Sequence, residues 1–247
     1  MAGKYGAIAA LARYAVRRLN SFVPRLLLLA ASAALACAPG AQRNPITPPV
    51  NTADLPIASD VAADSLLADV LSLAPRILVT LRYATADNFT GARIPGYEGN
   101  HAYLRRPAAE ALARVESELA SSRFGLKIFD AYRPARATEA MVEWTKRVHR
   151  EDLIRDGYIA SKSRHNLGVA VDLTLIRLND STELEMGTPF DTFSAAAHTA
   201  NATGAAARNR QLLKSAMERE GFTNYDQEWW HFIFSLPDQI RFDRVIR

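Results

Sequence analysis

The chain has 247 residues, of which 49% are hydrophobic and 23% are charged. These values are ordinary for a globular protein with room for a sizeable core. The net charge is +4, but five basic residues and no acidic residue lie within residues 1–36. Without them, 25 basic and 26 acidic residues remain. The nearly neutral remainder gives no electrostatic basis for binding nucleic acid, which we therefore exclude as a partner.

Residues 1–36 have the pattern of an export signal, in which an apolar run at 26–36 follows a basic stretch. Eleven residues suit a signal peptide and are too few to span a bilayer. Residues 34–36 (Ala-Leu-Ala) are typical of an ordinary signal peptidase site, whereas 35–37 (Leu-Ala-Cys) resemble an imperfect lipobox. The second interpretation predicts a lipid anchor at Cys37. We expect an exported protein of the periplasm or cell envelope, anchored to the membrane if Cys37 is lipidated.

The segment after the signal differs in composition from the rest of the chain. Residues 37–60 contain five prolines separated by polar and small residues, which predicts an extended tether. Cys37 is the only cysteine, so no internal disulfide can form. We predict one folded domain over residues 61–247.

Within this domain, helical and strand-like segments follow each other in no regular order. Pro107 at a first helical position and Gly221 after a last one mark two helix ends. Periodicity predicts helices at 63–73, 107–121, 137–150 and 205–220, strands at 77–83, 126–129, 169–175 and 228–234, and a loop at 84–103. The irregular order predicts an α+β fold with a mixed or antiparallel central sheet flanked by helices.

The first chemical motif joins a turn to the strand at 169–175. Alternation puts four aliphatic residues on one face of that strand, whereas Asp172 lies on the other with small and polar neighbours. This predicts a core face and an open, polar face. Asp is depleted in strands, and His165 in the preceding turn is placed to bind the same ion as Asp172. The alternative is a turn histidine and a hydrogen-bonded aspartate, and this segment alone does not decide between them.

The second motif places Glu228 and His231 among aromatic residues in the last predicted strand. A buried carboxylate without a partner has a raised pKa, which suits a general base. The alternative is a core histidine paired with an acid. Taken together, His165, Asp172 and His231 supply the three protein ligands typical of a catalytic zinc with one open position. We therefore predict one Zn²⁺ per chain, at the sheet, with Glu228 as the proton acceptor.

The third motif is Asp-Ala-Tyr-Arg-Pro at 130–134. The proline disfavours helix at Arg133, which follows a predicted strand and is placed to point into a cleft. A guanidinium there could stabilise an oxyanion on the attacked carbonyl. The alternative is a surface ion pair.

These motifs, in this order, resemble the D-alanyl-D-alanine dipeptidases (the VanX-like enzymes). The resemblance runs from about Leu81 to Phe234 and is carried by LRYATADNF (81–89), AYL (102–104), DAYRP (130–134), SRHNLGVAVDLTL (163–175), MGTPFD (186–191) and EWWHF (228–232). The pattern S-x-H-x6-D followed by E-x-W-H is shared with the wider group of zinc D,D-peptidases. MGTPFD narrows the match to the dipeptidases.

The resemblance implies a role for each matching residue. His165, Asp172 and His231 would bind zinc, Glu228 would be the general base and then acid, and Arg133 would stabilise the tetrahedral intermediate. Asp191 would receive the free amino group of a small dipeptide, while Tyr83 and Ser163 would help to bind its ends. Ala131 stands where the family commonly has glycine, and the export leader sets this chain apart from cytoplasmic members.

Two other functions fit part of the pattern. A zinc D,D- or L,D-carboxypeptidase acting on peptidoglycan stem peptides would keep the metal site and lack a barrier on the amine side, where Asp191 is predicted. A non-catalytic, zinc-stabilised binding module of the envelope would need neither Glu228 nor Arg133. Nothing in the sequence indicates an oligomeric state.

Overall fold

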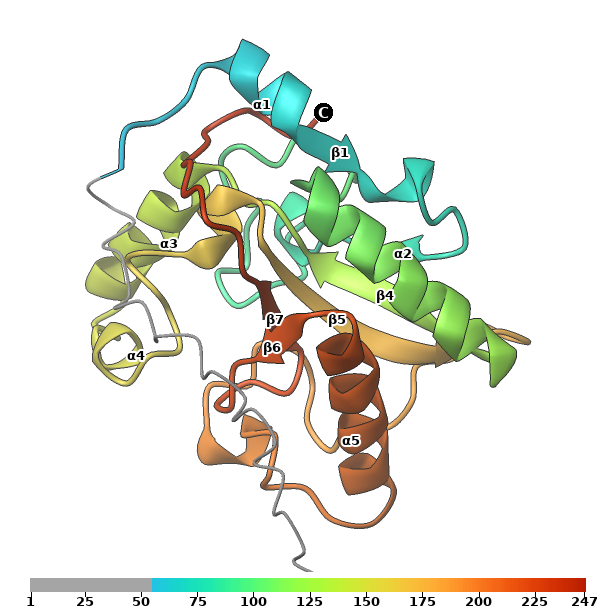
Figure 1. Cartoon of the computed structure of the whole chain (residues 1–247). Helices are drawn as coiled ribbons and strands as arrows, with labels where there is room; N and C mark the ends of the chain where they lie inside the picture. The colour runs from blue at the N-terminus through green and yellow to red at the C-terminus, as the bar shows by residue number, and fades with distance from the viewer. Residues whose placement is uncertain (1–54) are drawn as a thin grey trace, which may run out of the picture. The chain divides into compact units, whose positions relative to one another are not determined.

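The computed structural model describes residues 55–247, which form a mixed sheet with helices packed around it (Figure 1). The five-stranded sheet has the order β2-β4-β5-β7-β6, and only the β2–β4 pair is parallel. The strands are β1 (Leu67–Asp69), β2 (Leu78–Val79), β3 (Tyr103–Arg105), β4 (Phe124–Asp130), β5 (Ala170–Arg177), β6 (Phe222–Asn224) and β7 (His231–Phe234). Strands β1 and β3 form a separate antiparallel pair. The predicted α+β class is confirmed.

Except for the first, the helices predicted from the sequence lie close to helices of the structure. The helices of the structure are α1 (Asp60–Leu66), α2 (Arg106–Ser121), α3 (Ala135–Arg147), α4 (Asp152–Arg155) and α5 (Gly204–Arg219), with short 3₁₀ turns η2 (Val70–Ser72), η3 (Arg82–Ala84), η4 (Arg164–Leu167) and η5 (Ala195–Ala197). Pro107 lies in the first turn of α2, where its missing N–H costs no helical hydrogen bond. None of the helices between residues 55 and 247 is long and apolar enough to cross a membrane.

The folded body begins before the predicted boundary. The Ser59 side chain caps α1 by accepting a hydrogen bond from the N–H of Ala62, so the helix begins at Asp60 instead of Ala63. Ile57 forms a parallel bridge with Arg241, and the N–H of Ala58 donates to the Arg241 carbonyl at 2.8 Å. The last residues of the predicted tether are therefore attached to the domain. The predicted signal and the rest of the tether lie outside the described residues.

Two predicted strands are shorter than their patterns suggested. Of the predicted strand at 77–83, only β2 is a strand in the structure. The N–H of Leu81 donates to the Asn100 side chain instead, and the chain then enters η3. At 228–234, Glu228 lies in a turn and β7 starts at His231. Strand β5 is buried on both faces, so the predicted open face around Asp172 is wrong except at the site itself.

A register shift in β4 lines up three polar residues across the sheet. Ile128 pairs with Leu173, but the next residue to pair is Asp130, which lies opposite Asp172. Asp172 in turn lies opposite His231 on β7. Such a bulge adds one residue to a strand and re-aims the side chains that follow it. Direct cross-strand neighbours share a face of the sheet, so these three side chains form one row.

Gly168, which ends η4 just before β5, provides a test of this geometry. It has φ of +65°, and a Cβ there would lie 2.6 Å from the Leu67 side chain and 3.3 Å from the Arg105 backbone nitrogen. We expect Gly168→Ala to lower the free energy of unfolding by about 2–4 kcal/mol, from left-handed strain and overpacking together. Gly91→Ala, at φ of +72° with no atom nearby, should cost only about 1 kcal/mol. Urea unfolding of both variants checks this, and equal losses would contradict the close approach at Gly168.

Candidate active site

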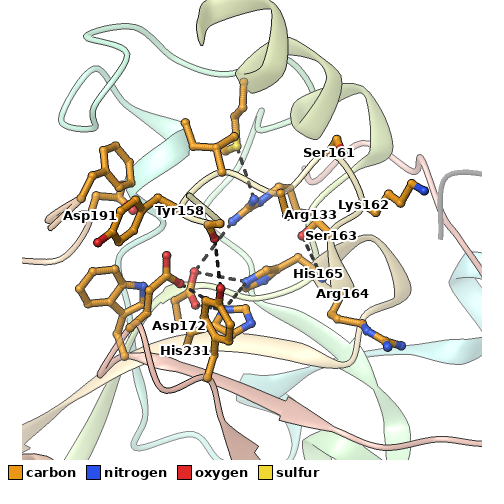
Figure 2. A pocket seen from close by; sticks show the side chains of 18 of the residues that line it. Arg133, Tyr158, Ser161, Lys162, Ser163, Arg164, His165, Asp172, Asp191 and His231 are labelled. Atoms are coloured by element: carbon orange, nitrogen blue, oxygen red, sulfur yellow. Dashed lines mark hydrogen bonds and ion pairs between the residues drawn. The ribbon is translucent and has the colours of Figure 1, made fainter. Parts of the chain in front are cut away.

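Two imidazoles converge on the Asp172 carboxylate. His231 Nδ1 lies 2.8 Å from Asp172 Oδ1, and His165 Nε2 lies 3.3 Å from Asp172 Oδ2. The two facing ring nitrogens are 3.2 Å apart. The three ligand atoms all lie within 4.8 Å of one another, which makes this group a candidate metal centre. Figure 2 shows the three side chains meeting at one point of the pocket wall.

The other ring nitrogen of His165 is held by the backbone. Its Nδ1 donates to the Ala131 carbonyl at 2.6 Å, which directs Nε2 toward Asp172. Metal-binding histidines commonly have this arrangement, in which a carbonyl fixes the tautomer and the ring orientation. Burial alone would raise the pKa of Asp172, but the charges and hydrogen bonds of the two imidazoles outweigh it and lower that pKa. An ionised carboxylate and two imidazoles are a donor set that fits a divalent metal ion.

Glu228 and Arg133 both lie close to the metal group. Glu228 Oε2 lies 3.9 Å from His231 Nδ1, and Arg133 Nη2 lies 3.9 Å from Asp172 Oδ2. Both residues are buried, with 8% of their surface exposed, although they line the pocket. Glu228 is carried by the turn before β7, so the strand that supplies a ligand also fixes its position.

Buried Asp130 holds Arg133 in place. Asp130 Oδ2 accepts from Arg133 Nε at 2.9 Å and from Nη2 at 2.8 Å. Its other oxygen accepts from the Tyr97 hydroxyl at 2.6 Å. The Arg133 guanidinium also lies 5.1 Å from the centre of the Tyr83 ring. The surface ion pair considered for Arg133 is therefore wrong, because its partner is an acid of the sheet interior.

All eight candidate site residues line one pocket of about 370 Å³, part of which Figure 2 shows. They are Tyr83, Arg133, Ser163, His165, Asp172, Asp191, Glu228 and His231. Ser163 caps η4 by accepting from the N–H of His165 at 3.2 Å, which places it beside a ligand. The chemical roles of these residues stay predictions. The pocket also has an aromatic wall that was not predicted from the sequence, formed by Phe89, Tyr158, Phe193, Tyr225 and Trp230.

Asp191 lies on the opposite side of the metal group from Ser163 (Figure 2). The Tyr83 hydroxyl lies 3.1 Å and 3.2 Å from its two oxygens and donates to that carboxylate. No ion pair to Asp191 forms among the described residues. Its backbone has φ of +59°, a left-handed conformation that Asp tolerates better than most residues. A half-buried carboxylate thus faces the pocket without a cation.

Three acids, Asp172, Asp191 and Glu228, line the pocket together with three cationic residues, Arg133, Lys162 and Arg164. Burial and the nearby Asp172 carboxylate raise the pKa of Asp191 to about 8, and the same causes raise the pKa of Glu228 well above its usual range. Arg133 opposes both shifts but is paired with Asp130. Among the described residues, neither Lys162 nor Arg164 forms an ion pair with these acids, so Asp191 is left able to pair with a bound cation.

Comparison with known proteins places the chain in a family. The family model described as D-Ala-D-Ala dipeptidase matches residues 64–246. The chain belongs to this family of metallopeptidases. It is 38% identical over 168 residues to a D-alanyl-D-alanine dipeptidase of Enterococcus faecium, covering 62% of this chain and 83% of that protein. It is 36% identical over 168 residues to a D-alanyl-D-alanine dipeptidase of Escherichia coli (strain K12), covering 67% and 83%.

Two solved structures are distant matches. The vancomycin resistance D,D-dipeptidase VanXYg, in complex with a D-Ala-D-Ala phosphinate analogue, is 17% identical with a TM-score of 0.35, covering 68% of this chain and 66% of that one. The LD-carboxypeptidase LdcB is 18% identical with a TM-score of 0.38, covering 53% and 59%. At such TM-scores the likeness carries no weight, and family membership follows from the sequence.

The metal group is testable without measuring catalysis. We expect the purified chain to bind one Zn²⁺. Losing a residue that only supports a metal ligand typically weakens metal affinity about 10- to 100-fold, and His231→Ala should weaken the zinc affinity by more than that. His101→Ala removes an exposed imidazole that pairs with Asp69 outside the pocket, and it should bind zinc like the wild type. Titration calorimetry measures both. Unchanged affinity in His231→Ala would show that the ion binds elsewhere.

Proposed function

We propose that this protein hydrolyses D-Ala-D-Ala-type dipeptides with a bound zinc ion, in cell-wall peptide metabolism. The observation that carries the proposal is the half-buried Asp191 carboxylate, which faces the same pocket as the metal group and has no cationic partner in the described structure. A free ammonium group of a short peptide is the charge that this position lacks. Family membership and the relatives named D-alanyl-D-alanine dipeptidase support the same substrate class.

The residues around the metal group would divide the chemistry. When bound by His165, Asp172 and His231, zinc polarises the scissile carbonyl and makes water more acidic. The Glu228 carboxylate takes a proton from the attacking water and passes it to the leaving nitrogen. Its burial raises its pKa, which makes it a stronger proton acceptor than an exposed carboxylate. The Arg133 guanidinium, fixed by Asp130, stabilises negative charge on the carbonyl oxygen.

The ends of the substrate would bind on opposite sides of this centre. Asp191, oriented by the Tyr83 hydroxyl, accepts the ammonium group, and the Ser163 hydroxyl helps to bind the other end. A site built around a buried partner discriminates strongly against ligands that leave it unpaired. A stem peptide carries an amide nitrogen in place of the ammonium group, so this pocket favours a dipeptidase over a carboxypeptidase. From the leader pattern alone we also propose that the reaction takes place in the periplasm or cell envelope.

The role of Glu228 predicts that binding and catalysis can be separated. With zinc and D-Ala-D-Ala, the wild-type protein should release D-alanine, and Glu228→Gln should be slower by about 10²–10⁴-fold because no group takes the proton. The variant should still bind one zinc, since Glu228 is not part of the metal group. EDTA should abolish wild-type release. A Glu228→Gln protein as active as the wild type would remove the proposed base and favour a contaminating activity.

The role of Asp191 predicts selectivity for short substrates. We expect D-Ala-D-Ala to be hydrolysed and a pentapeptide stem ending in D-Ala-D-Ala to survive, because its amide nitrogen cannot pair with the carboxylate. Asp191→Asn should lose most activity on the dipeptide while keeping its zinc. D-alanine release from both substrates is the measurement. Steady hydrolysis of the pentapeptide by the wild type would make the protein a carboxypeptidase.

A further inference from the structure

Arg210 on α5 is a buried cation with no carboxylate partner in the described structure. Its side chain is 2% exposed, and burial lowers its pKa. Each nitrogen of its guanidinium donates to a backbone carbonyl, with Nε 2.6 Å from Met186 O, Nη1 2.6 Å from His198 O and Nη2 3.1 Å from Ala196 O. Burying an arginine is costly, and here the whole planar fork is used to hold the main chain.

The three carbonyls belong to the two ends of one loop. The segment 186–198 leaves the body at Met186, passes Asp191 and returns at His198, so Arg210 ties its start to its end. Between these ends lie the acid proposed to bind the substrate ammonium and Phe193, which also lines the pocket.

The turn that carries Glu228 reaches the same loop through Trp229. Its indole N–H donates to Thr188 Oγ1 at 2.9 Å, and its backbone N–H donates to the Ala197 carbonyl at 3.1 Å. The Arg210 guanidinium lies 5.9 Å from the centre of the Trp229 ring. The proposed base and the amine-side loop are thus fixed by neighbouring contacts, and Arg210 supplies three of them.

We propose that Arg210 is a positioning residue for substrate selectivity, which closes the 186–198 loop so that Asp191 meets the amino group of a dipeptide. The proposal rests on the proposed role of Asp191. Asp191 makes its side-chain hydrogen bonds to Tyr83, on another segment, and has a left-handed backbone, so its position depends on where the ends of the loop are held. A loosened loop would weaken the recognition of the ammonium group more than it would weaken the chemistry at the metal group.

The test compares two substrates, D-Ala-D-Ala and N-acetyl-D-Ala-D-Ala, which differ in the charge that Asp191 would bind. The ratio of their kcat/KM values does not depend on the fraction of enzyme that is folded, so a merely structural loss leaves it unchanged. Asp191→Asn should reduce this ratio strongly. We expect Arg210→Met to reduce it by about 10- to 100-fold, the scale of a small misplacement of a binding group.

Two further variants distinguish an effect of the guanidinium geometry of Arg210 from an effect of its charge and from an effect of protein stability. Arg210→Lys keeps the charge, but one ammonium group cannot donate to three separated carbonyls. The kcat/KM ratio of this variant should therefore lie between those of Arg210→Met and the wild type. If Arg210→Met does not fold, Arg210→Lys alone tests the positioning role. Leu213→Ala removes a fully buried side chain from the same helix, and it should lower stability while leaving the ratio unchanged.

The outcomes separate the inference from the function it rests on. If Asp191→Asn lowers the ratio and both Arg210 variants keep the wild-type value, the positioning role is wrong and the amine site stands. If Asp191→Asn also keeps the wild-type ratio, the amine site itself is wrong and the role of Arg210 fails with it. A ratio that falls equally in Leu213→Ala would make the effect one of stability, which also overturns the proposal.

Discussion

A carboxylate buried in the middle of a sheet is unfavourable unless positive charge or strong hydrogen bonds meet it, and Asp172 is such a carboxylate. Two imidazoles meet it here, one from the neighbouring strand β7 and one from the turn before β5. The bulge in β4 brings Asp130 into the same row, and Asp130 in turn fixes Arg133. The metal group, the proposed base and the proposed oxyanion partner therefore all depend on the register of three adjacent strands.

The balance of charge connects this centre to the substrate. Asp172, Asp191 and Glu228 share a pocket with Arg133, Lys162 and Arg164; Arg133 is paired with Asp130, and the other two cationic residues are more exposed. Asp191 forms no ion pair among the described residues, so the ammonium group of the proposed substrate would supply its partner. Under the proposed function, a short zwitterionic peptide meets this carboxylate with an ammonium group, whereas a longer peptide offers a neutral amide nitrogen.

Much of this could be predicted from sequence, because the signals were local. An aspartate inside an apolar strand after a turn histidine, and a glutamate and a histidine among tryptophans, each stand out within ten residues. The bulge near Asp130 has no such signal, and the Tyr97 hydroxyl that binds Asp130 comes from a distant loop. Arg210 looked like an ordinary helix residue, since its carbonyl partners lie 12 to 24 positions away. Glu228 was placed in a strand because its aromatic neighbours favour strands, whereas the turn there is set by tertiary contacts.

The most direct test of this account is the anomalous difference density at the zinc edge in crystals of the zinc-loaded protein. The account predicts one strong peak per chain, about 2.0–2.2 Å from His165 Nε2, His231 Nδ1 and an oxygen of Asp172, with Glu228 outside the coordination sphere. A peak coordinated by Glu228, or one lying away from the Asp172 row, would contradict it.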